Sequence, residues 1–119
     1  MDLKVTERLF VYGTLKKGFS RNSVLSDSKY LGEFKTKPSF TMVDLGFFPG
    51  IFEKGNTSII GELYVVSQKV LQLCDEIEGH PNFYFRKKII LENELEVWCY
   101  LLDKNQYENK LKVSTGVWN

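Results

Sequence analysis

Hydrophobic residues come in short runs along the chain, separated by glycines and polar turns, and most of the runs are typical of β-strands. The first run, Arg8–Tyr12, is rich in β-branched and aromatic residues, which predicts a buried strand leading into a loop over Gly13–Gly18. Ile59–Val66 alternates enough to predict a second clear strand. One helical turn is predicted over Ser20–Leu25. Further strands are predicted over Tyr30–Lys35, Ser39–Val43, Gly50–Phe52, Arg86–Leu91 and Leu95–Leu102.

One segment has the period of a helix instead. Ser67 is suited to cap the start of this helix and Gly79 its end, and Pro81 prevents the helix from continuing. The apolar face of about three turns is formed by Val70, Leu71, Cys74 and Ile77. Many short strands with one clear helix predict an α+β domain whose sheet is curled or closed into a small barrel, with short flanking helical turns.

Composition narrows the class of protein. The chain has 119 residues, no repeat and no linker-like segment, so we expect one domain over residues 1–119. A net charge of +1 argues against nucleic acid as a partner, and the short apolar runs argue against a membrane span. Residues 1–8 are polar, without the apolar stretch of a signal peptide, so we expect an intracellular, cytoplasmic protein.

Metal binding is not expected from the sequence. Two cysteines, Cys74 and Cys99, and one histidine, His80, cannot supply four zinc ligands by themselves. Both cysteines fall on apolar faces and are interpreted as small buried residues, whereas His80 is expected in a loop.

The loop after the first strand has two glycines and a serine spaced as in a phosphate-binding loop. Phe19 stands where that pattern needs its phosphate-contacting lysine, and no long helix plainly follows, so nucleotide hydrolysis is rejected. Two interpretations stay open for Gly13–Gly18. It is either a turned backbone whose amides hold an anion such as a carboxylate, or an ordinary glycine-containing turn.

The end of the predicted helix carries three carboxylates, on Asp75, Glu76 and Glu78. Acidic groups are disfavoured at a helix C-terminus, and both the dipole and neighbouring like charges raise a carboxyl pKa toward the range of a general base. Glu76 and Glu78 lie about 200° apart around the helix axis, so only one of them can face a given cleft. The alternative is a solvated acidic helix end paired with nearby basic residues.

Aromatic and basic residues after the helix are further candidates for a site. Tyr84 and Arg86 stand two residues apart on an extended segment and so share a face, which would let them pack over the carboxylates. Tyr100 shares a face with Trp98 in the same way and is a candidate pocket wall, although a core position suits it equally well.

Six motifs stand in order along the chain: Phe10–Gly18, Phe48–Ile51, Gly61–Tyr64, Asp75–Pro81, Tyr84–Arg86 and Ser114–Trp118. Together, from about Leu9 to Trp118, they resemble the γ-glutamylcyclotransferase-like family, in particular its small bacterial-type and γ-glutamylamine cyclotransferase members. The resemblance implies that Tyr12, Gly13, Thr14 and Leu15 form the substrate-binding loop and that Glu78 is the proton acceptor. Tyr84, Arg86 and Tyr100, which are candidates from their place on the chain, are expected to contact the substrate as well.

The resemblance implies a small mixed β-barrel fold and a cofactor-independent, amide- or amidine-cleaving enzyme. Its substrate would be a small γ-glutamyl compound, cyclised to 5-oxoproline with release of an amine or amino acid. The segment Tyr84–Arg86 resembles the γ-glutamylamine branch. Arg21 and Val117 depart from the family pattern, standing where members often carry Asn and Asp. Two other functions remain: a non-catalytic module that binds a small anionic or zwitterionic metabolite, and an assembly domain that pairs through its strands.

Overall fold

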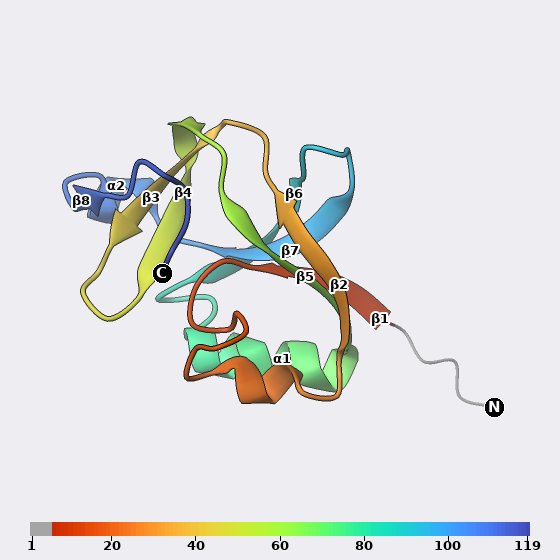
Figure 1. Cartoon of the computed structure of the whole chain (residues 1–119). Coiled ribbons are helices and arrows are strands. Elements are labelled where there is room, and N and C mark those ends of the chain that lie inside the picture. The colour runs from red at the N-terminus through yellow and green to blue at the C-terminus, as the bar shows by residue number, and fades with distance from the viewer. Residues whose placement is uncertain (1–5) are drawn as a thin grey trace.

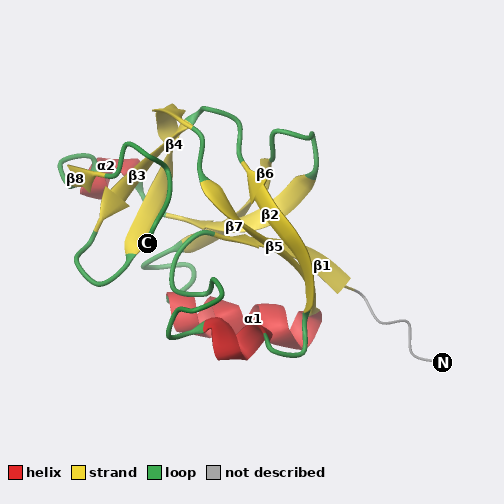
Figure 2. Ribbon diagram, in the orientation of Figure 1, coloured by secondary structure: helices red, strands yellow, loops and turns green. Residues whose placement is uncertain are grey.

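The computed structural model describes residues 6–119. It has eight strands, one main helix, a short helix and a 3₁₀ turn (Figures 1 and 2). Most of the polar segment 1–8, on which the expected lack of a signal peptide depended, lies outside these residues. In chain order the elements are β1 (Thr6–Val11), η1 (Asn22–Leu25), β2 (Lys29–Lys35), β3 (Phe40–Asp44), β4 (Pro49–Thr57), β5 (Ile60–Ser67), α1 (Gln68–Glu78), β6 (Phe85–Ile90), β7 (Glu96–Leu101), α2 (Lys104–Tyr107) and β8 (Leu111–Lys112).

Strand β1 is the centre of a five-stranded sheet with the order β2-β5-β1-β7-β6. It pairs antiparallel with β5 and parallel with β7. Leu9 and Val11 point into the core between the sheet and α1, whereas Phe10 and Tyr12 belong to a second core inside the curve of the sheet. A strand that is buried on both faces has a continuous run of apolar residues in its sequence. The predicted buried strand at Arg8–Tyr12 is therefore confirmed.

A separate three-stranded sheet, with the order β4-β3-β8, stands beside the larger one (Figure 1). Strand β4 is longer than the predicted Gly50–Phe52 and continues through Gly55 to Thr57. Gly55 has a φ of +140°, and a Cβ there would meet the Phe40 carbonyl oxygen at 2.5 Å, so only glycine allows the strand to pass. A register shift between Phe40 and Thr41 marks the irregularity on the partner strand.

The α+β class with one main helix is confirmed, but the two sheets do not close into a barrel over the described residues. The edge strands β2 and β6 of the larger sheet approach each other through one isolated bridge, between Thr36 and Leu91. The smaller sheet has its own hydrogen-bonded strands. None of the helices within residues 6–119 has the length and apolar character that crossing a membrane requires.

Helix α1 lies across one face of the large sheet and begins and ends where its sequence predicts (Figure 2). The Ser67 hydroxyl accepts a hydrogen bond from the Val70 amide at 3.1 Å, which satisfies one of the free amides of the first turn. Gly79 adopts the left-handed conformation, with φ of +68°, and its amide bonds back to the last helical carbonyls. The chain therefore turns sharply immediately after Glu78.

Candidate active site

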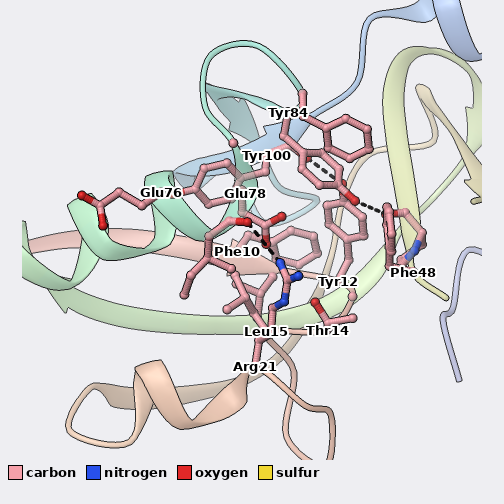
Figure 3. Close-up of a pocket in the computed structure, with 16 residues that line it drawn as sticks. Phe10, Tyr12, Thr14, Leu15, Arg21, Phe48, Glu76, Glu78, Tyr84 and Tyr100 are labelled. Atoms are coloured by element: carbon pink, nitrogen blue, oxygen red, sulfur yellow. Dashed lines mark hydrogen bonds between the residues drawn. The ribbon is translucent and has the colours of Figure 1, made fainter.

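The C-terminus of α1 and the loop after β1 face each other across a cavity of about 320 Å³ (Figure 3). The cavity wall brings together residues that the sequence predicts as a site, because Glu78, Gly13, Thr14, Leu15, Tyr84 and Tyr100 all line it together with Tyr12. Arg86 does not line the cavity. The wall also contains residues that the sequence analysis did not propose as a site, chiefly Arg21, Phe48, Pro49 and Phe83.

The loop after β1, whose residues line the cavity, has unpaired backbone amides. The amides of Gly13, Thr14 and Leu15 have no hydrogen-bond acceptor among residues 6–119, although the loop is otherwise well bonded. The Lys16 amide donates to the Gly13 carbonyl at 3.0 Å, and the Leu15 carbonyl accepts from the side chain of Asn22 at 2.8 Å. Three successive unpaired amides on a fixed turn can hold an anion such as a carboxylate.

Position 13 has no room for a side chain, because Pro49 of β4 lies against it. A Cβ at Gly13 would lie 2.9 Å from Cγ of Pro49, which is closer than carbon atoms normally approach. The Pro49 carbonyl in turn accepts a hydrogen bond from the Tyr84 hydroxyl at 2.5 Å. The loop, β4 and the segment before β6 therefore meet at this point and fix the width of the cavity.

Glu78 is the last residue of α1, and its half-buried side chain points into the cavity, while Glu76 is exposed and points away from it (Figure 3). Burial raises the pKa of Glu78 to about 7, although the Arg21 guanidinium lowers it in part. The sequence pattern predicted a different cause for a raised pKa, namely neighbouring carboxylates and the helix dipole. The cause is burial, because Glu76 is solvated and Asp75 is paired.

Asp75 is bound on the side of the helix away from the cavity. Both of its oxygens accept from Arg86, at 2.8 and 3.1 Å, and one also accepts from the Tyr100 hydroxyl at 2.7 Å. Burial alone would raise the pKa of Asp75, but these hydrogen bonds outweigh it and hold that pKa below its usual value. The end of α1 is thereby fixed to β6 and β7.

Arg86 has its partners outside the cavity. Besides Asp75 it contacts Trp98, whose ring centre lies 4.2 Å from the guanidinium carbon, and its amide donates to Nδ1 of His80 at 2.9 Å. Tyr84 precedes β6, which begins at Phe85, so the two-residue alternation that predicted a shared face for Tyr84 and Arg86 does not extend to Tyr84. His80 is a loop residue, as predicted.

Three tyrosines form walls of the cavity, and each donates its hydroxyl to a protein acceptor. Tyr12 donates to the Tyr100 carbonyl at 2.6 Å, Tyr84 to Pro49 and Tyr100 to Asp75. Burial raises the pKa of all three phenols, so they remain neutral. They shape the cavity, and the ionisable group left facing it from the helix is Glu78.

The sequence model of one family, described as γ-glutamyl cyclotransferase, AIG2-like, matches residues 9–119. The chain belongs to the γ-glutamyl cyclotransferase, AIG2-like family. The matched span contains every residue of the cavity wall, and it confirms the resemblance drawn from the motifs.

Individual members support the same assignment. A Methanocaldococcus jannaschii protein, provisionally named a γ-glutamylcyclotransferase, is 43% identical over 100 residues, which are 79% of this chain and 82% of that one. A Vibrio cholerae protein with the same provisional name is 36% identical over 110 residues, which are 92% and 93% of the two chains. The crystal structure of an AIG2-like protein from Mus musculus matches with a TM-score of 0.83 over 96% of this chain and 88% of that one, at 22% identity, which shows a shared fold.

The raised pKa makes this family member's stability depend on pH through Glu78. Because the pKa rises from 4.5 to about 7 on folding, the protonated group adds stability below about pH 4.5, and that stability is lost as the pH rises through about 7. Glu78→Gln removes the buried charge. We expect the variant to exceed the wild type in free energy of unfolding by about 2–3 kcal/mol at about pH 8, and by little at about pH 4.5.

Urea denaturation at both pH values measures this difference. The matched control is Glu76→Gln, which removes an exposed carboxyl from the same helix and should change stability by less than about 0.5 kcal/mol at either pH. A gain from Glu78→Gln that is the same at both pH values would contradict burial of an ionisable Glu78.

The ion pair between Arg86 of β6 and Asp75 of α1 should contribute more to stability than the exposed ion pairs of β6. Arg86→Met leaves Asp75 half-buried without its partner, and we expect a loss of about 2–3 kcal/mol in free energy of unfolding, somewhat less than for a fully buried pair. Lys87→Met, which breaks the exposed pair with Glu53, should cost less than about 1 kcal/mol. Equal losses in the two variants, measured by chemical denaturation, would argue against this anchor.

Proposed function

We propose that this protein is a γ-glutamyl cyclotransferase that converts a γ-glutamyl amine or γ-glutamyl amino acid to 5-oxoproline and releases the amine, with Glu78 as the general base. The observation that carries the proposal is a half-buried carboxyl of raised pKa that shares a cavity with three unpaired amides. Membership of the γ-glutamyl cyclotransferase, AIG2-like family supports the reaction class.

The substrate has to be held folded for this reaction, because its nucleophile and electrophile are parts of one molecule. The amides of Gly13, Thr14 and Leu15 would bind the α-carboxylate, which fixes the α-carbon near the helix end. Aromatic walls at Tyr12 and Tyr84 would exclude the extended conformers. Holding reacting groups in the correct orientation contributes as much as about 7–11 kcal/mol to lowering a barrier.

Proton transfer then completes the reaction. Glu78 takes a proton from the α-ammonium group, and the freed nitrogen lone pair attacks the γ-carbonyl carbon to give a tetrahedral intermediate. The bond from that carbon to the leaving nitrogen breaks as Glu78 returns the proton to that nitrogen and takes the second proton of the ring nitrogen. Glu78 then passes this second proton to the released amine, so the products are 5-oxoproline and the amine in its ammonium form, and no redox or group-carrier chemistry is required.

The other residues of the site act through position in this scheme. Tyr84 and Tyr100 would contact the substrate through their rings, since their hydroxyls are bonded to Pro49 and Asp75. Arg86 would hold the helix end, and with it Glu78, rather than contact the substrate. The single-domain organisation, the cytoplasmic location and the lack of a nucleic-acid partner stay predictions from the sequence.

Replacing the base tests the assignment. Glu78→Gln keeps the shape of the side chain and removes its basicity, so we expect at least a 100-fold loss in kcat with binding of 5-oxoproline retained. Release of 5-oxoproline should be measured over a panel of a γ-glutamyl amine, an ε-lysyl isopeptide, a γ-glutamyl amino acid and glutathione.

Glu76→Gln serves as the control, because its carboxylate points away from the cavity and its loss should leave kcat within about twofold. Near-normal turnover by Glu78→Gln would refute the role of Glu78. A wild-type protein that binds 5-oxoproline but converts no member of the panel would instead be a binding module.

The pH profile gives an independent prediction. A general base works in its deprotonated form, so kcat/KM should rise with pH and level off above a midpoint near 7, the raised pKa of Glu78. The phenols of Tyr12 and Tyr84 face Glu78 and stay neutral over this range, because burial raises the pKa of both. A profile already level above pH 5 would contradict the proposal.

A further inference from the structure

Arg21 is a cation on the cavity wall that forms no ion pair with the described residues. Within residues 6–119 it is the only lysine or arginine that lines the cavity. Glu78 is nevertheless near enough for Arg21 to lower the pKa of that carboxyl. A guanidinium at a cavity that is not engaged in an ion pair can bind a carboxylate of a ligand.

Two hydrogen bonds fix Arg21 between the loop after β1 and the end of α1. Its backbone amide donates to the Thr14 carbonyl at 3.0 Å, and its Nη1 donates to the Ile77 carbonyl at 3.1 Å. Figure 3 shows the guanidinium directed toward Glu78, on the side of the cavity occupied by Thr14 and Leu15. For Nε and Nη2 the described residues provide no acceptor, so these donors are free to bind a ligand.

The structure of the glutamyl unit requires its α-carboxylate to lie close to Glu78 when Glu78 acts on the α-amino group. The α-amino nitrogen and the carboxylate carbon are bonded to the same atom and lie about 2.5 Å apart. If Glu78 takes a proton from that nitrogen, the carboxylate must lie beside Glu78 as well. Arg21 lies next to Glu78 through its bond to the Ile77 carbonyl, and next to the unpaired amides through its bond to the Thr14 carbonyl. It is therefore close to both the base and the expected position of the carboxylate.

The charge of Arg21 also suits the base. A substrate carboxylate beside Glu78 would disfavour the ionised form of that residue, and the positive charge of Arg21 acts in the opposite direction on the pKa of Glu78. Among the described residues of the cavity wall Glu78 faces no other cation, and the phenols of Tyr12, Tyr84 and Tyr100 around it are neutral.

We propose that Arg21 binds the α-carboxylate of the glutamyl unit together with the neighbouring loop amides and is therefore a specificity-determining residue for substrates with a free α-carboxylate. The inference rests on the proposed function for the identity of the ligand. The guanidinium and the three amides would together enclose one carboxylate, and the amino group on the same carbon would then face Glu78.

A pair of product ligands tests the contact without any turnover. 5-Oxoproline and its neutral carboxamide differ only in the charged group, and their dissociation constants should be measured by calorimetry for wild type, Arg21→Gln and Arg21→Lys. We expect Arg21→Gln to weaken 5-oxoproline about tenfold or more and the carboxamide less than about twofold, with Arg21→Lys in between. Arg8→Gln, which removes an exposed arginine of β1 outside the cavity wall, should change neither constant.

An equal loss for both ligands would overturn the inference, because it would mean that Arg21 acts only by holding the helix end through Ile77. No loss for either ligand would overturn it too. If wild type binds 5-oxoproline but converts no γ-glutamyl compound, the proposed function fails and the Arg21 comparison still decides the inference. If wild type does not bind 5-oxoproline, both fail.

A second pair of ligands separates the two ends of the substrate. γ-Glutamylphenylalanine carries a carboxylate on its leaving group, and γ-glutamylphenethylamine lacks it. Arg21→Gln should lower kcat/KM for both by the same factor, about tenfold. A loss confined to γ-glutamylphenylalanine would show that Arg21 binds the leaving group instead, which contradicts the inference.

Discussion

The site depends on one costly placement, a carboxyl group at the end of a helix that is turned into a cavity instead of into water. Burial of Glu78 raises its pKa to about 7, so the ionised form is destabilised in the folded protein. Packing elsewhere has to offset that cost. The helix is capped by Ser67 and Gly79 and tied to β6 and β7 through Asp75, which fixes the position of the helix end that carries Glu78.

Within the described part of the chain, two charged side chains, Glu78 and Arg21, are directed into the cavity. Asp75 is neutralised by Arg86 behind the helix, and the wall tyrosines donate their hydroxyls to protein acceptors. What remains facing the cavity is Glu78, Arg21 and a set of free backbone amides. These groups match the two charged groups of an amino acid, because Glu78 can accept a proton from the α-ammonium and the other groups can donate hydrogen bonds to the α-carboxylate.

Features encoded locally were predictable from the sequence, and features created by distant contacts were not. Helix α1 follows from its apolar spacing and its two caps, and the 200° separation correctly implied that Glu76 and Glu78 face different ways. The position of Arg86 depends on Asp75, eleven residues away on another element, and no spacing rule reports it. The extension of β4 through Gly55 likewise depends on the backbone of Phe40. Helix α2 and strand β8 are too short to leave a periodic signal.

The central claim is that Glu78 sits in the cavity with a pKa near 7, and its titration can be followed directly. Carbon-13 NMR of the glutamate side-chain carboxyls, with Glu78 identified by its loss in Glu78→Gln, records this carboxyl's own midpoint. The account predicts a midpoint near 7, well separated from those of the exposed glutamates. A midpoint near the ordinary 4.5 would mean that the carboxyl is solvated, and the assignment of Glu78 as the base would be contradicted.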